Sequence, residues 1–156
     1  MSAAAVLAAA RARGLTIATA ESCTGGMVAA ALTDIAGASD VVERGFVTYS
    51  NAAKREMLGV QAATLDAHGA VSEAVAREMA LGALAHSPAG LAVAITGIAG
   101  PGGSGFKPEG RVCFAVALRG GEPRVETVDF GPLGRAAVRA AATRHALALL
   151  LAACQP

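Results

Sequence analysis

Ser22 lies in a short segment whose residue types suit nucleophilic catalysis. It follows a stretch rich in β-branched residues, 15–20, which predicts a strand, and it precedes a Thr-Gly-Gly segment, 24–26, that opens an apolar run of helical length. A hydroxyl at this point lies beside unpaired N–H groups of the helix start, and such donors stabilise an oxyanion. The turn therefore predicts a serine nucleophile. A simple helix cap is the alternative interpretation, and Cys23 is a rival nucleophile.

A serine nucleophile needs a base, and lysine is the best candidate in this chain. The three histidines, His68, His86 and His145, lie outside any recognisable catalytic pattern. Lysine acts as a general base when burial disfavours its charged form, whereas arginine does not release its proton. Only two of the thirteen basic residues are lysines, Lys54 and Lys107, and both lie close to predicted strand ends. The commoner alternative for either is a solvated surface lysine.

A glycine-rich segment, 96–105, predicts a loop that grips substrate or covers it, with a plain mobile loop as the alternative. It contains the spacing G-x-G-x-x-G at Gly100, Gly102 and Gly105. A dinucleotide fingerprint requires a helix to follow, but here Pro108 and a strand-like segment come next. A phosphate-binding Walker loop is excluded too, because no Ser or Thr follows the lysine of this loop.

Composition excludes several functional classes. The net charge is +1 without a basic patch and aromatic residues make up 3% of the chain, so we expect no nucleic-acid partner. The three cysteines are widely spaced, which indicates neither a disulfide framework nor a metal site and fits a reducing cytoplasm. The longest apolar run, 146–154, is too short to cross a bilayer, so we expect no membrane association.

The elements that must position these residues follow from periodicity and turn signals. Strands alternate with helices up to residue 96, and a hairpin and a final helix follow. Strands are predicted at 15–20, 44–49, 91–96, 110–118 and 124–130, the last two antiparallel. Helices are predicted at 3–13, 27–32, 51–58, 61–67, 72–86 and 133–153. On the final helix the apolar period predicts an inner face of Val138, Ala142, His145, Leu149 and Ala152. This order predicts one three-layer α/β/α domain over residues 1–156, with a mixed, partly parallel sheet.

Several separate motifs, in order along the chain, resemble the CinA C-terminal domain family. They are Ala20-Glu-Ser-Cys-Thr-Gly-Gly26, Gly45-Phe-Val-Thr-Tyr-Ser-Asn51 with Lys54, Gly69-Ala-Val-Ser-Glu73, and Thr96-Gly-Ile-Ala-Gly-Pro101 with Lys107-Pro108 and Gly110. The stand-alone members of this family are nicotinamide-nucleotide amidohydrolases. The resemblance implies hydrolysis of nicotinamide mononucleotide to nicotinic acid mononucleotide and ammonia, without a metal or an organic cofactor.

Transferred by motif, the resemblance makes Ser22 the nucleophile, Lys54 the general base and Tyr49 a neighbour at the site. It places Thr96 and Gly97 in the loop that lines the substrate pocket. Our inference from the turn adds the amides of Thr24, Gly25 and Gly26 as oxyanion donors.

Other parts of the site stay open at this level. Glu21 either orients Lys54, faces the pyridinium cation of the substrate, or acts as a helix-start carboxylate. The substrate phosphate has three candidate sites: amides of the glycine-rich loop, the start of the helix after Gly25, and an arginine such as Arg44 or Arg111. We expect a homo-oligomer. The competing functions are a nucleotide-binding module without turnover and an amidohydrolase for a different amide.

Overall fold

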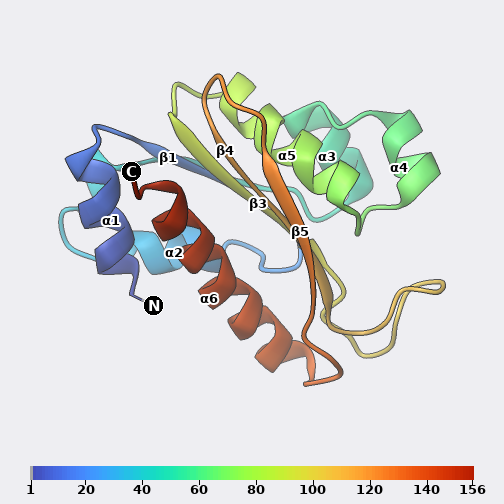
Figure 1. The fold of residues 1–156 in the computed structure, drawn as a ribbon. Helices are drawn as coiled ribbons and strands as arrows, with labels where there is room; N and C mark the ends of the chain where they lie inside the picture. Colours follow the sequence, from blue (N-terminus) through green and yellow to red (C-terminus); the bar gives the residue numbers. More distant parts are fainter. Residues whose placement is uncertain (1) are drawn as a thin grey trace.

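A five-stranded mixed sheet forms the centre of the molecule (Figure 1), described by a computed structural model for residues 2–156. Its strands are β1 (Ile17–Glu21), β2 (Val42–Val47), β3 (Leu91–Gly97), β4 (Arg111–Leu118) and β5 (Arg124–Asp129). The order across the sheet is β2-β1-β3-β4-β5. β1 pairs parallel with both β2 and β3, and the pairs β3–β4 and β4–β5 are antiparallel. The predicted mixed, partly parallel sheet is confirmed.

Helices cover both faces of the sheet, so the predicted three-layer α/β/α arrangement is confirmed (Figure 1). One face carries α1 (Ala3–Ala12), α2 (Met27–Thr33) and α6 (Arg135–Ala153). The other face carries α3 (Asn51–Leu58), α4 (Ala62–His68) and α5 (Glu73–Ala85). A short 3-10 helix, η1 (Ala38–Asp40), was not predicted from the sequence.

Helix α6 is long and apolar enough to span a bilayer by length and composition alone, although no single apolar run within it is. In the structure it packs on β3 and β4 and contacts α1 and α2, as a core helix does. Its predicted inner face is only partly right. Val138 and Ala142 are buried, but the buried stripe continues through Ala146 and Leu150, and Ala152 is exposed. A stripe with a spacing of four residues fits the sheet better than the one predicted.

Helix α3 is fixed closely at both ends, which matters because it carries Lys54. The Ser50 hydroxyl accepts a hydrogen bond from the Ala53 amide at 3.0 Å, and Gly59 ends the helix with a positive φ of 72°. The end of α3 lies against α5 at Gly82, where an added Cβ would be 2.0 Å from the Leu58 carbonyl oxygen. Only glycine permits this close packing.

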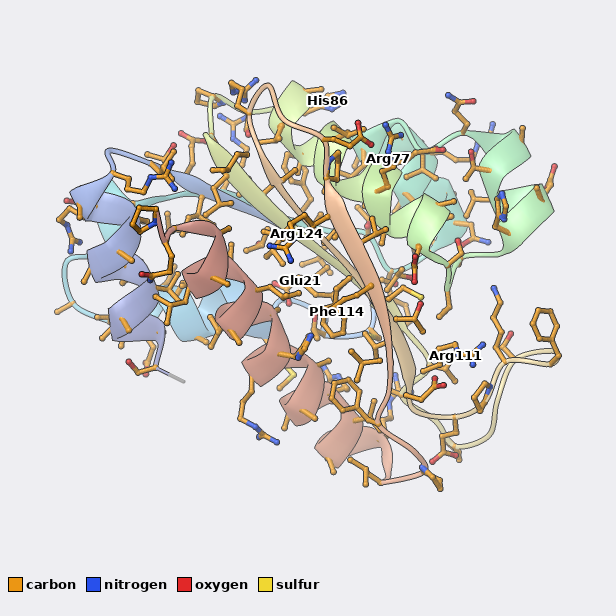
Figure 2. All side chains as sticks on the ribbon, viewed as in Figure 1. Glu21, Arg77, His86, Arg111, Phe114 and Arg124 are labelled. Atoms are coloured by element: carbon orange, nitrogen blue, oxygen red, sulfur yellow. The ribbon has the colours of Figure 1, made fainter. Side chains whose placement is uncertain are left out.

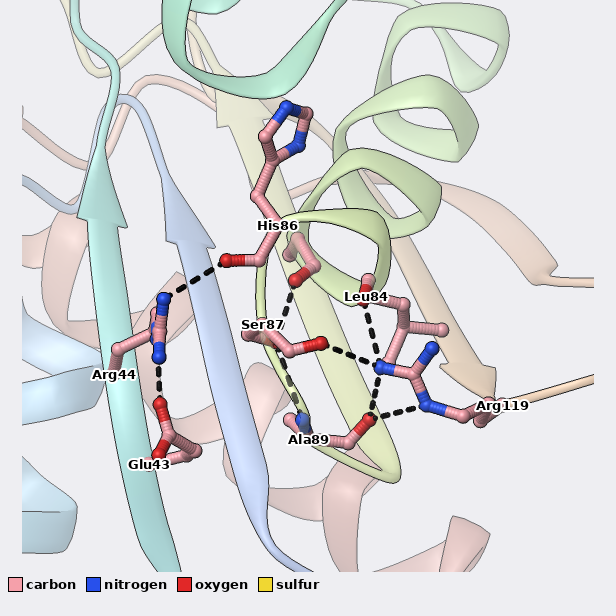
Figure 3. A network of polar contacts seen from close by, with 8 residues as sticks. Glu43, Arg44, Leu84, His86, Ser87, Ala89 and Arg119 are labelled. Atoms are coloured by element: carbon pink, nitrogen blue, oxygen red, sulfur yellow. Dashed lines mark hydrogen bonds and ion pairs between the residues drawn. The ribbon is translucent and has the colours of Figure 1, made fainter.

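A polar network fixes the loop between α5 and β3, at the sheet end opposite the carboxyl ends of β1 and β3 (Figure 3). The Arg119 guanidinium donates hydrogen bonds to the carbonyls of Leu84, Ser87 and Ala89. Arg44 pairs with Glu43 and donates to the His86 carbonyl at 2.9 Å. This end of the sheet is therefore occupied by structural contacts, and the opposite end holds the candidate site.

Candidate active site

Ser22 and Lys54 meet at the carboxyl end of β1, as the sequence predicted. Ser22 directly follows β1, and its amide donates to the Ile95 carbonyl of β3 at 2.9 Å, which fixes the residue between two parallel strands. Lys54 Nζ lies 3.0 Å from Ser22 Oγ. This is hydrogen-bond distance between a hydroxyl and the amine proposed to deprotonate it.

The surroundings of Lys54 favour the neutral amine. The side chain is 1% exposed, and burial lowers the pKa of Lys54 below its ordinary value of 10.5. Within residues 2–156, the only other hydrogen-bond partners of Nζ are the carbonyl oxygens of Thr48 at 2.9 Å and Tyr49 at 3.1 Å. All three partners are oxygen atoms that accept hydrogen bonds from Nζ, so burial, and not the set of partners, favours the neutral form. A neutral amine at this position has a lone pair that can accept the Ser22 proton.

Glu21 supports the turn from inside the protein. Its side chain is fully buried and lies in the interior of the molecule (Figure 2). Its two carboxylate oxygens accept hydrogen bonds from the Val28 and Ala29 amides at 2.9 and 3.0 Å. α2 begins after Gly26, which has a φ of 106° and no side chain to cap the helix. Glu21 therefore supplies the missing cap from the adjacent strand. Of the three roles considered, the structure gives it the helix-start carboxylate, and Glu21 does not line the pocket.

The predicted oxyanion donors are placed less favourably than expected. The Gly25 amide donates to the Ser22 carbonyl at 3.0 Å and is therefore occupied. Thr24 is fully buried, and neither it nor Gly26 lines the pocket. The Cys23 amide donates to no other residue within 2–156, and Cys23 does line the pocket. Because the Ser22 carbonyl and the Cys23 N–H belong to one trans peptide, they point in opposite directions, so the Cys23 N–H points away from Gly25.

Cys23 is poorly suited to be the nucleophile. Its side chain is buried, and burial raises the pKa of the Cys23 thiol to about 11, although the charges of Arg139 and Lys54 oppose this. Its sulfur fills the space beside Gly97, where an added Cβ would lie 3.0 Å from Sγ. The thiol stays protonated near neutral pH and acts as a packing residue.

A cleft of about 370 Å³ opens over Ser22 and Lys54. Its walls come from the turn after β1, the start of α3, the segment before α5 and the glycine-rich loop after β3. Thr96 and Gly97 line it as predicted. The Thr96 hydroxyl donates to the Ala70 carbonyl at 2.8 Å and so joins two of these walls.

Arg135, which the sequence analysis missed, closes the cleft on the side of α6. Its guanidinium donates to Tyr49 Oη at 2.6 Å and to the Gly100 carbonyl at 2.8 Å. It forms no ion pair with a carboxylate of residues 2–156. Tyr49 lines the cleft with a 59% exposed side chain, and its backbone carbonyl contacts Lys54. One sequence signal could have found it, because Arg135 lies in the first turn of the helix predicted at 133–153, where an arginine opposes the helix dipole.

The other basic residues that the sequence analysis considered lie outside the cleft. Arg111 forms a two-point pair with Asp129. Arg44 belongs to the network described above. Lys107 Nζ donates to the carbonyls of His68 at 2.5 Å and Val71 at 2.7 Å, so this second candidate base instead ties the glycine-rich loop to the segment after α4. In residues 2–156, no group of three or more His, Cys, Asp or Glu side chains is arranged to hold a metal ion.

Comparison with known proteins shows which family the chain resembles. The profile of the CinA C-terminal domain matches residues 1–154. The nicotinamide-nucleotide amidohydrolase PncC of Escherichia coli is 57% identical over 141 residues, covering 90% of this chain and 85% of that protein. A CinA-like protein of Mycolicibacterium vanbaalenii is 55% identical over 138 residues, covering 88% of this chain but 32% of that longer protein.

Solved structures show the same fold at high similarity. The crystal structure of the competence/damage inducible protein CihA of Agrobacterium tumefaciens superposes with a TM-score of 0.95 at 51% identity, covering 98% of this chain and 93% of that one. A competence damage-inducible protein of Klebsiella pneumoniae gives a TM-score of 0.93 at 44% identity, covering 96% and 92%. The profile match over nearly the whole chain, together with these relatives and structures, shows that the chain belongs to the CinA C-terminal domain family.

Proposed function

We propose that this chain hydrolyses the carboxamide of nicotinamide mononucleotide to nicotinic acid mononucleotide and ammonia through an acyl-enzyme on Ser22. The observation that carries the proposal is the 3.0 Å contact between Ser22 Oγ and the buried amine of Lys54 at the floor of the cleft. The similarity to the amidohydrolase of Escherichia coli supports the choice of substrate. We place the activity in the cytoplasm, in keeping with three free, buried cysteines.

The first half of the reaction forms the acyl-enzyme. Neutral Lys54 accepts the Ser22 proton, and Oγ attacks the carboxamide carbon. The pyridinium ring withdraws electrons from this carbon and so activates it. The Cys23 amide, directly after the nucleophile, is our candidate oxyanion donor, in the position that such a donor has in other serine hydrolases. Protonated Lys54 then gives its proton to the departing nitrogen, which leaves as ammonia.

The second half releases the product. Lys54, neutral again, takes a proton from a water molecule, and the resulting hydroxide attacks the ester carbonyl. The tetrahedral intermediate collapses, Ser22 Oγ recovers its proton from Lys54, and the carboxylic acid leaves and loses its proton to solvent. The Tyr49 hydroxyl, which Arg135 holds at the mouth of the cleft, assists the departure of ammonia in the first half. No step in this sequence requires a second nucleophile from the protein.

Arg135 is our candidate for binding the substrate phosphate, in place of Arg44 and Arg111. It lines the cleft and has no carboxylate partner in residues 2–156, whereas Arg44 pairs with Glu43 and Arg111 with Asp129. A guanidinium whose partners are all neutral keeps an unpaired positive charge, and it can therefore bind a phosphate.

The test is ammonia release by the purified protein, with a metal chelator present, from nicotinamide mononucleotide and from the same nucleoside without its phosphate. We expect turnover of the nucleotide and much weaker turnover of the nucleoside. Binding of the nucleotide without ammonia release would show a binding module and contradict the proposal. Equal turnover of both compounds would reject a binding site for the phosphate, and turnover only of other amides would reject the nucleotide as the substrate. Either result would retain the Ser22 chemistry.

A further inference from the structure

A second arginine of α6, Arg139, contacts the nucleophile turn from behind the cleft. Its Nε donates to the Cys23 carbonyl at 2.9 Å, and Nη2 lies 3.4 Å from the Thr24 carbonyl. Arg139 forms no ion pair with a carboxylate in residues 2–156 and does not line the cleft. A guanidinium whose partners are two neutral carbonyls of one turn is arranged to hold that turn.

The turn is shaped to receive this guanidinium. Gly25 has a φ of 59°, and a Cβ on it would lie 3.1 Å from Arg139 Nη2. The glycine therefore serves two purposes at once, since it adopts a left-handed conformation and leaves room for the arginine. A side chain here would crowd the Arg139 guanidinium and strain the left-handed backbone of Gly25.

Each carbonyl at the start of the turn thus has a donor. The Gly25 amide holds the Ser22 carbonyl, Arg139 holds the Cys23 carbonyl, and Glu21 holds the amides of α2 on the far side of the turn. Because the peptide unit is planar, the Gly25 contact with the Ser22 carbonyl fixes the direction of the Cys23 N–H, and the Arg139 contact with the Cys23 carbonyl fixes the next peptide unit. Arg139 therefore acts on the Cys23 amide and on Ser22 through the turn, by holding the peptide unit that lies between the Cys23 amide and Gly25.

We propose that Arg139 is a positioning residue for the nucleophile: it holds the turn of residues 22–25 through its carbonyls, so that Ser22 Oγ stays on Lys54 and the Cys23 amide faces the substrate. Arg139 touches neither the cleft nor the reacting atoms. Its loss lowers the rate of Ser22 acylation and leaves substrate affinity nearly unchanged. This inference rests on the proposed function only in taking Ser22 as the nucleophile.

The experiment measures Ser22 reactivity with two independent readouts. The first is the rate at which a fluorophosphonate reagent, which releases fluoride, labels Ser22. The second is kcat and KM for ammonia release from nicotinamide mononucleotide. The variants are Arg139→Ala and Arg139→Lys, and the control is Arg144→Ala, which removes the same charge from an exposed position of the same helix. Circular dichroism and the unfolding temperature show which variants are folded.

We expect Arg139→Ala to lower both the labelling rate and kcat by roughly 10- to 100-fold, the size of effect that misplacement of a reacting group by about 1 Å produces. KM should change less than about threefold, because uniform binding is retained. For Arg139→Lys, which keeps the charge but not the two-point geometry, the labelling rate and kcat should lie between those of the wild type and Arg139→Ala. Millimolar guanidinium should partly restore both rates in Arg139→Ala. Arg144→Ala should match the wild type.

The inference is overturned if folded Arg139→Ala has the labelling rate and kcat of the wild type, whether or not its unfolding temperature is lower. Where a variant does not fold, Arg139→Lys and guanidinium rescue decide the question. A wild type that reacts with the fluorophosphonate but releases no ammonia contradicts the proposed function, while the labelling rates still decide the role of Arg139. A wild type that does not label contradicts both.

Discussion

At the scale of single residues, the buried amine of Lys54 should give the protein a characteristic pH dependence. Catalysis needs the neutral amine, so kcat/KM should rise with pH through the pKa of Lys54, which burial lowers below 10.5. A pH profile of ammonia release by the wild type measures this ascending limb. An activity that is flat or falls across the same range would contradict a lysine base.

The free energy of unfolding should also depend on pH through Lys54. Since the pKa of Lys54 is lower in the folded state, the unfolded chain binds more protons between that pKa and 10.5. The free energy of unfolding of the wild type, relative to Lys54→Met, should therefore increase as pH rises through this window and be constant below it. Urea unfolding of both proteins across the window provides the check.

Cys23 should be dispensable for chemistry despite lying next to the nucleophile. With its pKa at about 11, the thiol is protonated at neutral pH, so Cys23→Ala should retain kcat within about threefold while losing a fraction of the packing against Gly97. Native wild type should also react slowly with iodoacetamide at pH 8. Loss of kcat in a folded Cys23→Ala variant by a hundredfold would reverse the assignment of the nucleophile.

The site residues predicted from the sequence belong to local motifs, and the cleft and turn residues that come from a distant helix were missed. Ser22 and Lys54 stand at a strand end and in a helix start, where type and position are both informative. Arg135 and Arg139 lie more than a hundred residues after Ser22, and nothing local shows that α6 ends up beside the turn. Glu21 had a correct interpretation among its alternatives, but only the fold selects it.

At the scale of elements, the glycine-rich loop should depend on Lys107 for its position over the cleft. Lys107→Ala removes the hydrogen bonds to the His68 and Val71 carbonyls. A hydrogen bond from a charged donor typically contributes about 1.5–3 kcal/mol to stability. We expect KM for the nucleotide to rise roughly tenfold with kcat nearly unchanged, because the loop binds but does not react. Steady-state kinetics tests this.

Phe106, beside Lys107 in the same loop, offers a matched control. It is 89% exposed, so Phe106→Ala should leave both constants unchanged. A large kcat effect of Lys107→Ala would place this lysine in the chemistry, which the 3.0 Å contact of Lys54 with Ser22 argues against.

Element types were predictable because their periods and caps are local, whereas packing was not. Every predicted strand and helix is present, with shifted ends, and Ser50 and Ser72 cap α3 and α5 through their side chains. The inner face of α6 was partly wrong because alanine-rich helices offer several apolar stripes, and contact with the sheet decides among them. His145 shows this, because it is half-buried at the edge of the buried face of α6, where its Nε2 contacts the Glu126 carboxylate.

At the scale of the whole molecule, α6 contributes both to the core and to the site. We expect its second half to affect stability and its start to affect activity. Leu150, fully buried in the second half of α6, belongs to the core, whereas Arg135 and Arg139 are at its start. Leu150→Ala should reduce the free energy of unfolding by about 2–5 kcal/mol, as large-to-small core changes do. Urea unfolding measures this loss, and kcat/KM of the folded variant at low temperature should equal that of the wild type. A tenfold loss of kcat/KM in the folded variant would show that the whole helix is coupled to the turn.

The fold class was predictable from the order of elements, because alternating strands and helices followed by a hairpin permit few layered arrangements. The cleft was not, because its walls come from five segments that are far apart in the chain. A homo-oligomer stays a prediction from the alanine-rich helices, and sedimentation of the purified protein tests it.

The central claim is that Ser22 is a nucleophile activated by Lys54, and the most direct test compares ammonia release by the wild type, Ser22→Ala, Lys54→Ala and Cys23→Ala under identical conditions. The account predicts that Ser22→Ala and Lys54→Ala each lose a factor on the order of a hundred or more in kcat while remaining folded, and that Cys23→Ala stays close to the wild type. Full activity in folded Ser22→Ala, or loss confined to Cys23→Ala, would contradict it.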